Sequence, residues 1–173
     1  MATMFVIKLV VFTLALGFGE AYLHQINWGG FLQAAVASVA GWLASVFDGG
    51  ITYQDNVIFA TDQTLMVTLE CTALFAKGLF CAAAIAYPCT WRARLIGCVV
   101  GIVGVGALNV LRISGLVLIA QWVPGFFHFA HLVLMQWFLI SCVAPLWLAW
   151  AMWTGRRARR TAEGMKGSAV DGG

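Results

Sequence analysis

Five apolar runs dominate the pattern of hydrophobic and polar positions along this chain of 173 residues. They cover residues 4–19, 30–47, 72–88, 95–121 and 128–153. A helix needs about 20 mostly apolar residues to cross the ~30 Å hydrocarbon core of a bilayer. The first, third, fourth and fifth runs are expected to do so. The pattern therefore predicts an all-α polytopic membrane protein with about four transmembrane helices.

The second run, 30–47, is richer in Ala, Ser and Gly than the others. If it also crossed the bilayer, Arg92 and Arg94 would fall on the outer side, which the positive-inside rule disfavours. We interpret this run as one embedded or interfacial helix, packed on the bundle through its small residues. A full crossing by residues 30–47 remains the alternative.

The segment 49–69 has a different character from the apolar runs. It combines strand-forming residues with turn signals at Gly49-Gly50 and Asp55-Asn56. This combination predicts a small extracytoplasmic β-hairpin that leads the chain into Glu70 and Cys71.

Composition and charge support a membrane protein and give it an orientation. Only 10% of the residues are charged and the mean hydropathy is +0.90, whereas a soluble domain has about 25% charged residues. The acids before the tail lie between Glu20 and Glu70, and most bases lie within 92–94 and 156–160. The positive-inside rule makes the basic segments cytoplasmic. We predict a single membrane-embedded domain over 1–154 and a basic, disordered cytoplasmic tail over 155–173.

The first apolar run has a second interpretation. Lys8 lies inside the run rather than before it, and its side chain can snorkel to the cytoplasmic interface. We therefore expect an uncleaved anchor. A cleaved signal peptide is the alternative, because Gly17-Phe18-Gly19 offers small residues at a cleavage-like spacing.

Three polar residues stand where lipid would disfavour them. Arg112 lies 17 residues beyond Leu95, or about 25 Å up from the cytoplasmic side. Cys71 begins one helix that descends from the outer face, and His131 lies near the start of another. All three are expected at one depth near the outer face. Lys77, below Cys71 on the same helix, is expected to snorkel outward.

These three side chains suit acyl transfer through a thioester. A thiolate is the nucleophile, an arginine can hold a thiolate or an oxyanion without losing its charge, and a histidine can move a proton near neutral pH. No H-E-x-x-H and no phosphate loop occurs, so no metal or organic cofactor is expected. The five cysteines form no C-x-x-C pair, which argues against a thiol oxidoreductase.

Other roles for these residues stay open. Arg112 could be a structural charge that pairs with Glu70 or with a helix C-terminus. Glu70 could instead orient the histidine or be solvated. Asn109, one turn before Arg112, could bind substrate backbone or make a helix–helix hydrogen bond. His128 lies one turn before His131 and is the reserve candidate for the acid/base.

Three motifs, in this order along the chain, resemble the exosortase/archaeosortase family. The resemblance covers about residues 50–140, and the short length is similar to the small single-module forms such as exosortase H. One departure is Ala73, where the family often has glycine. The motifs are Glu70-Cys71-Thr72-Ala73-Leu74, Asn109-Val-Leu-Arg112-Ile113 and His131-Leu132 with Trp137 beyond.

The resemblance implies a membrane cysteine protease/transpeptidase. Such an enzyme cleaves the C-terminal hydrophobic sorting signal of exported proteins through a thioester. Cys71 would be the nucleophile, Arg112 the stabilising cation and His131 the acid/base, with Glu70 and Asn109 as candidate substrate-binding residues. The implied place is a bacterial inner membrane, with the active site facing the periplasm. The implied partners are the sorting-signal helix and membrane lipids, with no nucleic acid.

Two other classes of function compete with this interpretation. The first is a non-catalytic membrane transport or assembly subunit, with Arg112 as a structural intramembrane charge. The second is a membrane acyltransferase that uses Cys71 on a lipid-linked acyl donor. Within the protease interpretation, either an amine or water could accept the acyl group.

Overall fold

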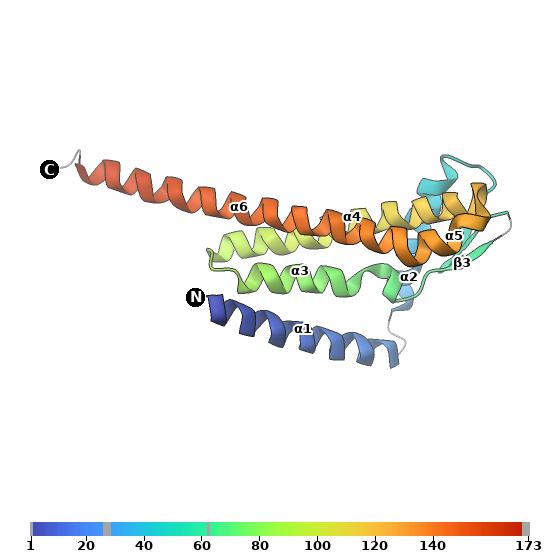
Figure 1. Cartoon of the computed structure of the whole chain (residues 1–173), viewed down its shortest axis with the longest axis horizontal. Helices are drawn as coiled ribbons and strands as arrows, with labels where there is room; N and C mark the ends of the chain where they lie inside the picture. The colour runs from blue at the N-terminus through green and yellow to red at the C-terminus, as the bar shows by residue number, and fades with distance from the viewer. Residues whose placement is uncertain (1, 26–28, 62, 171–173) are drawn as a thin grey trace.

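The computed structural model describes residues 2–25, 29–61 and 63–170. Four helices extend along one common direction (Figure 1): α1 (Ala2–Gln25), α3 (Leu74–Ala86), α4 (Trp91–Trp122) and α6 (Met135–Val170). Each of these helices contains one of the apolar runs of the sequence. Thr90 caps the N-terminus of α4, because its side-chain oxygen accepts a hydrogen bond from the N–H of Ala93. α3 lies between α1 and α4 and packs against both.

Within the described part of the chain, three helical segments are long and apolar enough to cross a membrane. They are Thr3–Tyr22, Trp91–Trp122 and Pro124–Arg157. α3 has only 13 residues and spans about 20 Å, so length alone does not make it a fourth crossing. The multi-pass membrane class is therefore confirmed, and the predicted count of four crossings stays a prediction.

The shorter apolar helix α2 (Gly30–Ser45) lies at the end of the bundle where the strands are. Figure 1 shows it running across the direction of the long helices. Its buried face consists of small residues, including Ala40 and Gly41, and the Ser114 hydroxyl of α4 donates to the Ala40 carbonyl at 3.0 Å. A Cβ at Gly41 would lie 2.8 Å from the Tyr53 ring. The fold thus contains the expected small-residue helix, and its depth in the bilayer stays a prediction.

The expected hairpin is part of a three-stranded antiparallel sheet. β1 (Thr52–Gln54), β2 (Val57–Phe59) and β3 (Thr64–Met66) pair in chain order. Tyr53 and Leu65 flank Ile58, whose side chain is fully buried. The sequence interpretation expected only a hairpin over 49–69, so the third strand, β3, was not predicted.

Two sets of hydrogen bonds fasten the sheet to the C-terminal end of α4. The indole of Trp122 donates to Asp48 at 3.1 Å. The Gln121 amide accepts from the N–H of Thr61 and donates to its hydroxyl, both at 2.8 Å. The sheet therefore has a fixed position beside the turn that carries Cys71.

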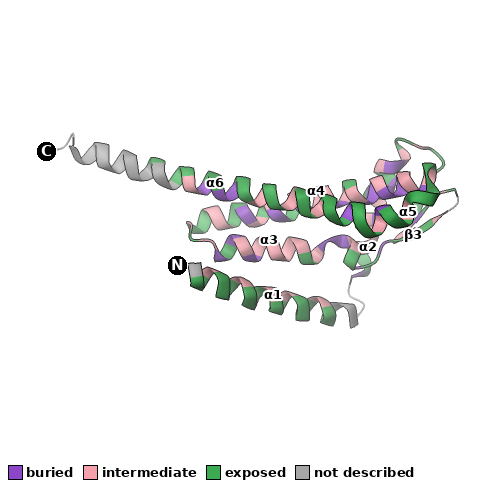
Figure 2. Ribbon diagram, viewed as in Figure 1, coloured by how far each residue is buried: buried purple, intermediate pink, exposed green. Residues whose placement is uncertain are grey.

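The exposed surface of the long helices is largely apolar. Figure 2 shows the outward faces of α1 and α6 as exposed, and large hydrophobic side chains such as Leu14, Phe18 and Ile140 are more than half exposed. Lipid tails are the solvent in which such faces carry no penalty. α6 continues as helix to Val170, beyond the last apolar run, and the disordered tail over 155–173 stays a prediction. The domain limit at residue 154 stays a prediction.

Candidate active site

Cys71 lies on a single 3-10 turn, η1 (Glu70–Thr72), between the sheet and α3. Ala73 follows in the left-handed conformation, with φ 53° and ψ 32°, and separates η1 from α3. This conformation costs a non-glycine residue about 1–2 kcal/mol, and the burial of the Ala73 methyl group partly offsets that cost. The thiol is therefore held above α3 instead of within it.

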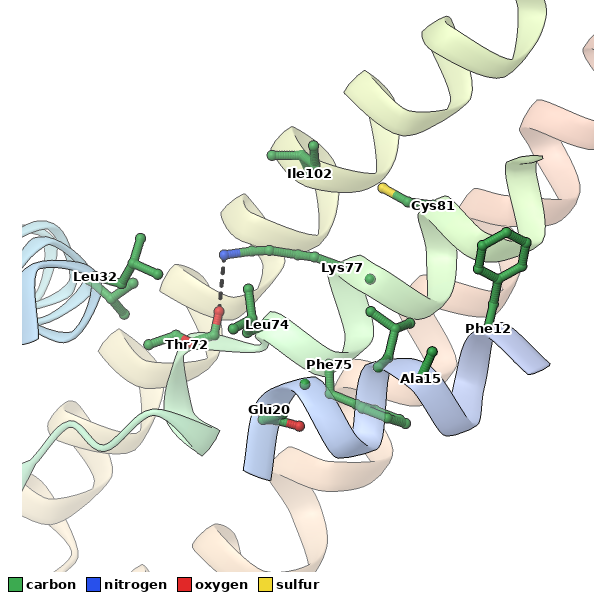
Figure 3. Close-up of a pocket in the computed structure, with 14 residues that line it drawn as sticks. Phe12, Ala15, Glu20, Leu32, Thr72, Leu74, Phe75, Lys77, Cys81 and Ile102 are labelled. Atoms are coloured by element: carbon green, nitrogen blue, oxygen red, sulfur yellow. Dashed lines mark hydrogen bonds between the residues drawn. The ribbon is translucent and has the colours of Figure 1, made fainter. Parts of the chain in front are cut away.

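Three side chains donate hydrogen bonds to carbonyl groups in and next to this turn. The Thr72 hydroxyl donates to Leu69 O at 2.6 Å, and Asn109 Nδ2 donates to Cys71 O at 2.6 Å. Lys77 Nζ donates to Thr72 O at 3.0 Å, as Figure 3 shows. The Lys77 ammonium group thus extends towards the N-terminal end of α3, the end expected to face outward, and binds the Cys71 turn there.

The thiol itself is partly exposed and has a hydroxyl neighbour. Thr68 Oγ1 lies 3.5 Å from Cys71 Sγ and can donate a hydrogen bond to it. The sequence analysis did not identify Thr68. Its position three residues before Cys71 brings the two side chains together only because Cys71 lies on a 3-10 turn. An incoming group can therefore reach the sulfur from the surface at this end of the bundle.

Asn109 connects Cys71 to Arg112. The Asn109 side chain is 1% exposed. While its Nδ2 binds the Cys71 carbonyl, its Oδ1 accepts from an Arg112 terminal nitrogen at 3.4 Å. Arg112 also has a buried Nε with no hydrogen-bond partner in the described part of the chain. One buried amide thus joins the thiol-bearing turn to the intramembrane cation.

His131 lies on the third element at this end, a π-helical turn η3 (Ala130–Leu134). π-helical turns are rare in proteins, and those that occur are often found at functional sites. The His131 ring stacks on Phe127, with ring centroids 5.9 Å apart, and its buried Nδ1 has no partner among the described residues. Arg112 and His128 both lie within electrostatic range of His131. His128 is exposed, so His131 is the better-placed candidate.

Two carboxyl groups lie at the rim of this region. Glu70 is exposed on η1, directly before Cys71. Glu20, near the end of α1, lies close enough to interact electrostatically with it. The proximity of Glu70 to the end of α1 depends on the α1–α3 packing, which the sequence does not reveal.

A groove of about 590 Å³ begins beside the Cys71 turn and follows α1 and α3 (Figure 3). Thr72 is at one end, and Glu20 and Lys77 are the charged side chains that line it. The remaining lining is mostly apolar: Phe12, Ala15, Leu16, Gly19, Leu32, Val36, Leu74, Phe75, Gly78, Cys81 and Ile102. An apolar segment held there would lie next to the nucleophile candidate.

The structure thus links Cys71, Asn109 and Arg112 by hydrogen bonds and brings His131 within electrostatic range of Arg112. Within the described residues, no group of three or more His, Cys, Asp or Glu side chains could hold a metal ion. A sequence model of a family described as transmembrane exosortase (Exosortase_EpsH) matches residues 1–149. No curated protein and no solved structure matches the chain.

Proposed function

Because the chain belongs to the transmembrane exosortase family, we propose that it is a membrane cysteine protease/transpeptidase. It cleaves the C-terminal hydrophobic sorting signal of exported proteins through a thioester. The Asn109 bridge between the Cys71 turn and Arg112 carries the proposal. Acyl transfer needs a nucleophile and a cation that can stabilise an oxyanion, and Asn109 connects the turn that carries the partly exposed Cys71 to the half-buried Arg112.

In the first half-reaction, His131 takes the thiol proton and Cys71 Sγ attacks the scissile carbonyl carbon. The carbonyl oxygen becomes an oxyanion, which Arg112 stabilises. The C–N bond then breaks, and His131 gives its proton to the leaving amine. The products are a thioester on Cys71 and the released C-terminal helix.

In the second half-reaction, an amine or water attacks the thioester. His131 removes a proton from this nucleophile, the C–S bond breaks, and the thiolate is regenerated and reprotonated by His131. Asn109 keeps the Cys71 turn and Arg112 in register throughout. Its two hydrogen bonds inside the protein favour this positioning role over the predicted substrate-binding role.

The groove between α1 and α3 is the proposed seat of the first apolar turns of the sorting signal. The apolar lining of the groove suits a hydrophobic helix. Thr72 lines one end of the groove, so that end lies next to Cys71. Glu70, exposed beside the thiol, remains a candidate to contact the polar residues before the scissile bond.

We place the active site on the periplasmic side of a bacterial inner membrane. The support is the distribution of charge, since Arg92, Arg94 and the arginines of α6 lie at the opposite end of the long helices from Cys71. The positive-inside rule makes that basic end cytoplasmic.

The alternative is a non-catalytic transport or assembly subunit. The hydrogen bond from Asn109 on α4 to the Cys71 carbonyl on η1 is the observation that favours it, because a buried amide can serve only to hold two segments together. The two functions differ in what they require of the Cys71 sulfur.

The proposal is tested in the source cells by comparing exported proteins after replacement of Cys71. With Cys71→Ala, exported proteins that end in a hydrophobic helix and a basic cluster should retain that tail, because cleavage falls by roughly 10⁴-fold or more. Cys142→Ala is the matched control, since Cys142 is a half-buried cysteine on α6. Normal C-terminal peptides in the Cys71→Ala strain would instead favour the non-catalytic subunit.

A further inference from the structure

A second polar region lies at the end of the bundle far from Cys71. A cavity of about 1130 Å³ opens between the start of α4 and the last apolar turns of α6. The Trp150 indole on α6 donates to Ala93 O on α4 at 3.2 Å, so these two walls are joined directly. None of the residues that the proposed reaction uses lines this cavity.

The described lining carries positive charge only. Arg92, Arg94 and Arg157 contribute guanidinium groups, and no Asp or Glu is among the lining residues. Guanidinium groups bind phosphate through paired N–H donors. The cavity also lies at the N-terminus of α4, whose 32 residues add a positive helix-dipole end. The cavity is therefore electrostatically suited to an anion.

Two of the arginines that line the cavity have distinct surroundings. The Arg157 guanidinium lies 5.0 Å from the centre of the Trp153 ring. Arg94 has a buried Nε with no hydrogen-bond partner among the described residues. Burial raises the pKa of the adjacent Cys89 thiol, and Arg94 opposes that rise only in part. The thiol stays neutral at pH 7 and does not compensate the Arg94 charge.

The position along the helices identifies the source of the anion. One apolar span begins at Trp91 and another ends at Arg157, so the cavity lies at the level of the lipid headgroups. Tyr87, Trp91 and Trp153 line it, and such rings favour that interface. A neighbouring cavity of about 360 Å³ shares Arg94 with the basic cavity. Apolar side chains such as Phe5 form most of its remaining wall, and Lys8 adds a second positive charge.

We propose that this basic cavity binds the phosphate headgroup of an anionic phospholipid, with part of an acyl chain against the apolar side chains of the neighbouring cavity. Arg94 lines both spaces and contacts the phosphate at their junction. The bound lipid would tie together the N-terminal end of α1, the start of α4 and the end of the α6 span.

Native mass spectrometry of the full-length protein in detergent tests this site with dioctanoyl phosphatidylglycerol as probe. The wild type should retain one lipid, and the paired variant Arg94→Gln/Arg157→Gln should weaken its binding at least tenfold. Dioctanoyl phosphatidylcholine should bind the wild type at least tenfold more weakly. Millimolar inorganic phosphate should not displace the lipid, which separates a headgroup site from a free-phosphate site.

Arg156→Gln is the matched control, because Arg156 is an exposed neighbour on α6 that does not line the cavity. It should change lipid binding less than twofold. Arg92→Gln, at an exposed position, is the second test variant in case the paired variant does not fold, and it should weaken binding several-fold. Equal retention by the wild type and Arg92→Gln, equal losses in Arg92→Gln and Arg156→Gln, or displacement by inorganic phosphate would overturn the proposal.

Discussion

The Asn109 side chain binds both the turn that carries Cys71 and the Arg112 side chain. It is buried at the contact of η1 with α4, and both ends of its amide are used. The motif order made Asn109 a candidate from the sequence, but its partners could not be deduced. They depend on how closely the Cys71 turn approaches α4, which no local pattern encodes.

Asn109→Ala should lower the rate of sorting-signal cleavage by roughly 10–100-fold, since small displacements of reacting groups have effects of this size. The variant should also change how fast iodoacetamide alkylates Cys71, because the turn loses its anchor. Leu111→Ala is the control, as Leu111 is 53% exposed on the same helix. Cleavage and alkylation at wild-type rates would show that the bridge does not position the thiol.

Ala73 stands where the family often has glycine, and its left-handed backbone gives the physical reason for glycine there. Ala73→Gly relieves the conformational cost but removes a buried methyl group worth about 0.8 kcal/mol, so the free energy of unfolding should change by less than about 1 kcal/mol. Ala73→Val should be destabilising by about 1–3 kcal/mol. Denaturant unfolding in detergent measures both. A valine variant as stable as the wild type would contradict the left-handed turn.

At the scale of elements, the lengths of the apolar runs predicted the helices, whereas the sequence predicted the sheet only in part. Three of the predicted spans are present with the expected order, and the small-residue run forms α2. A hairpin was expected over 49–69, but each strand has only three residues, too few for an alternating pattern to show how many strands the segment forms. α6 extends past the apolar run because helical propensity in 155–170 does not require apolar residues.

The attachment of the sheet to α4 should depend on pH through Asp48. Hydrogen bonds from the Gly50 N–H and then from the Trp122 indole hold the pKa of the Asp48 carboxyl below its ordinary value. A lowered folded-state pKa gives stability that is present above the unfolded pKa and is lost as the pH falls through the folded one.

Asp48→Ala should therefore melt at a lower temperature than the wild type at pH 7. The difference between the two melting temperatures should become smaller below the ordinary aspartate pKa of about 3.9. Thermal unfolding at pH 7 and pH 3 in the same detergent measures it. A gap that stays constant between the two pH values would mean that the carboxylate charge does not contribute.

The groove between α1 and α3 gives a second prediction at this scale. Ala15→Trp should fill part of the groove and slow cleavage of the sorting signal by about 10-fold or more, because the apolar segment loses its seat. Val11→Trp is the control, since Val11 is 59% exposed on α1 and does not line the groove. If both variants cleave at the wild-type rate, the signal binds elsewhere.

At the scale of the whole molecule, the two ends of the bundle have different chemistry. Cys71, Arg112 and His131 belong to elements that meet at the end with the sheet, and the arginines of α4 and α6 line the other. The sequence predicted this separation from charge distribution and helix length. It could not predict the groove or the basic cavity, which arise only when α1, α3, α4 and α6 pack together.

The central claim is that Cys71 forms a thioester with the substrate. Mass spectrometry of the Cys71 peptide, after rapid acid quenching of cells that are processing substrate, tests it most directly. The account predicts a thioester adduct on Cys71 with the mass of the exported-protein peptide that ends at the cleavage site, on the acyl side of the broken bond, and neutral hydroxylamine should remove it. A fatty acyl group on Cys71, or a Cys71 that stays unmodified while cleavage proceeds, would contradict it.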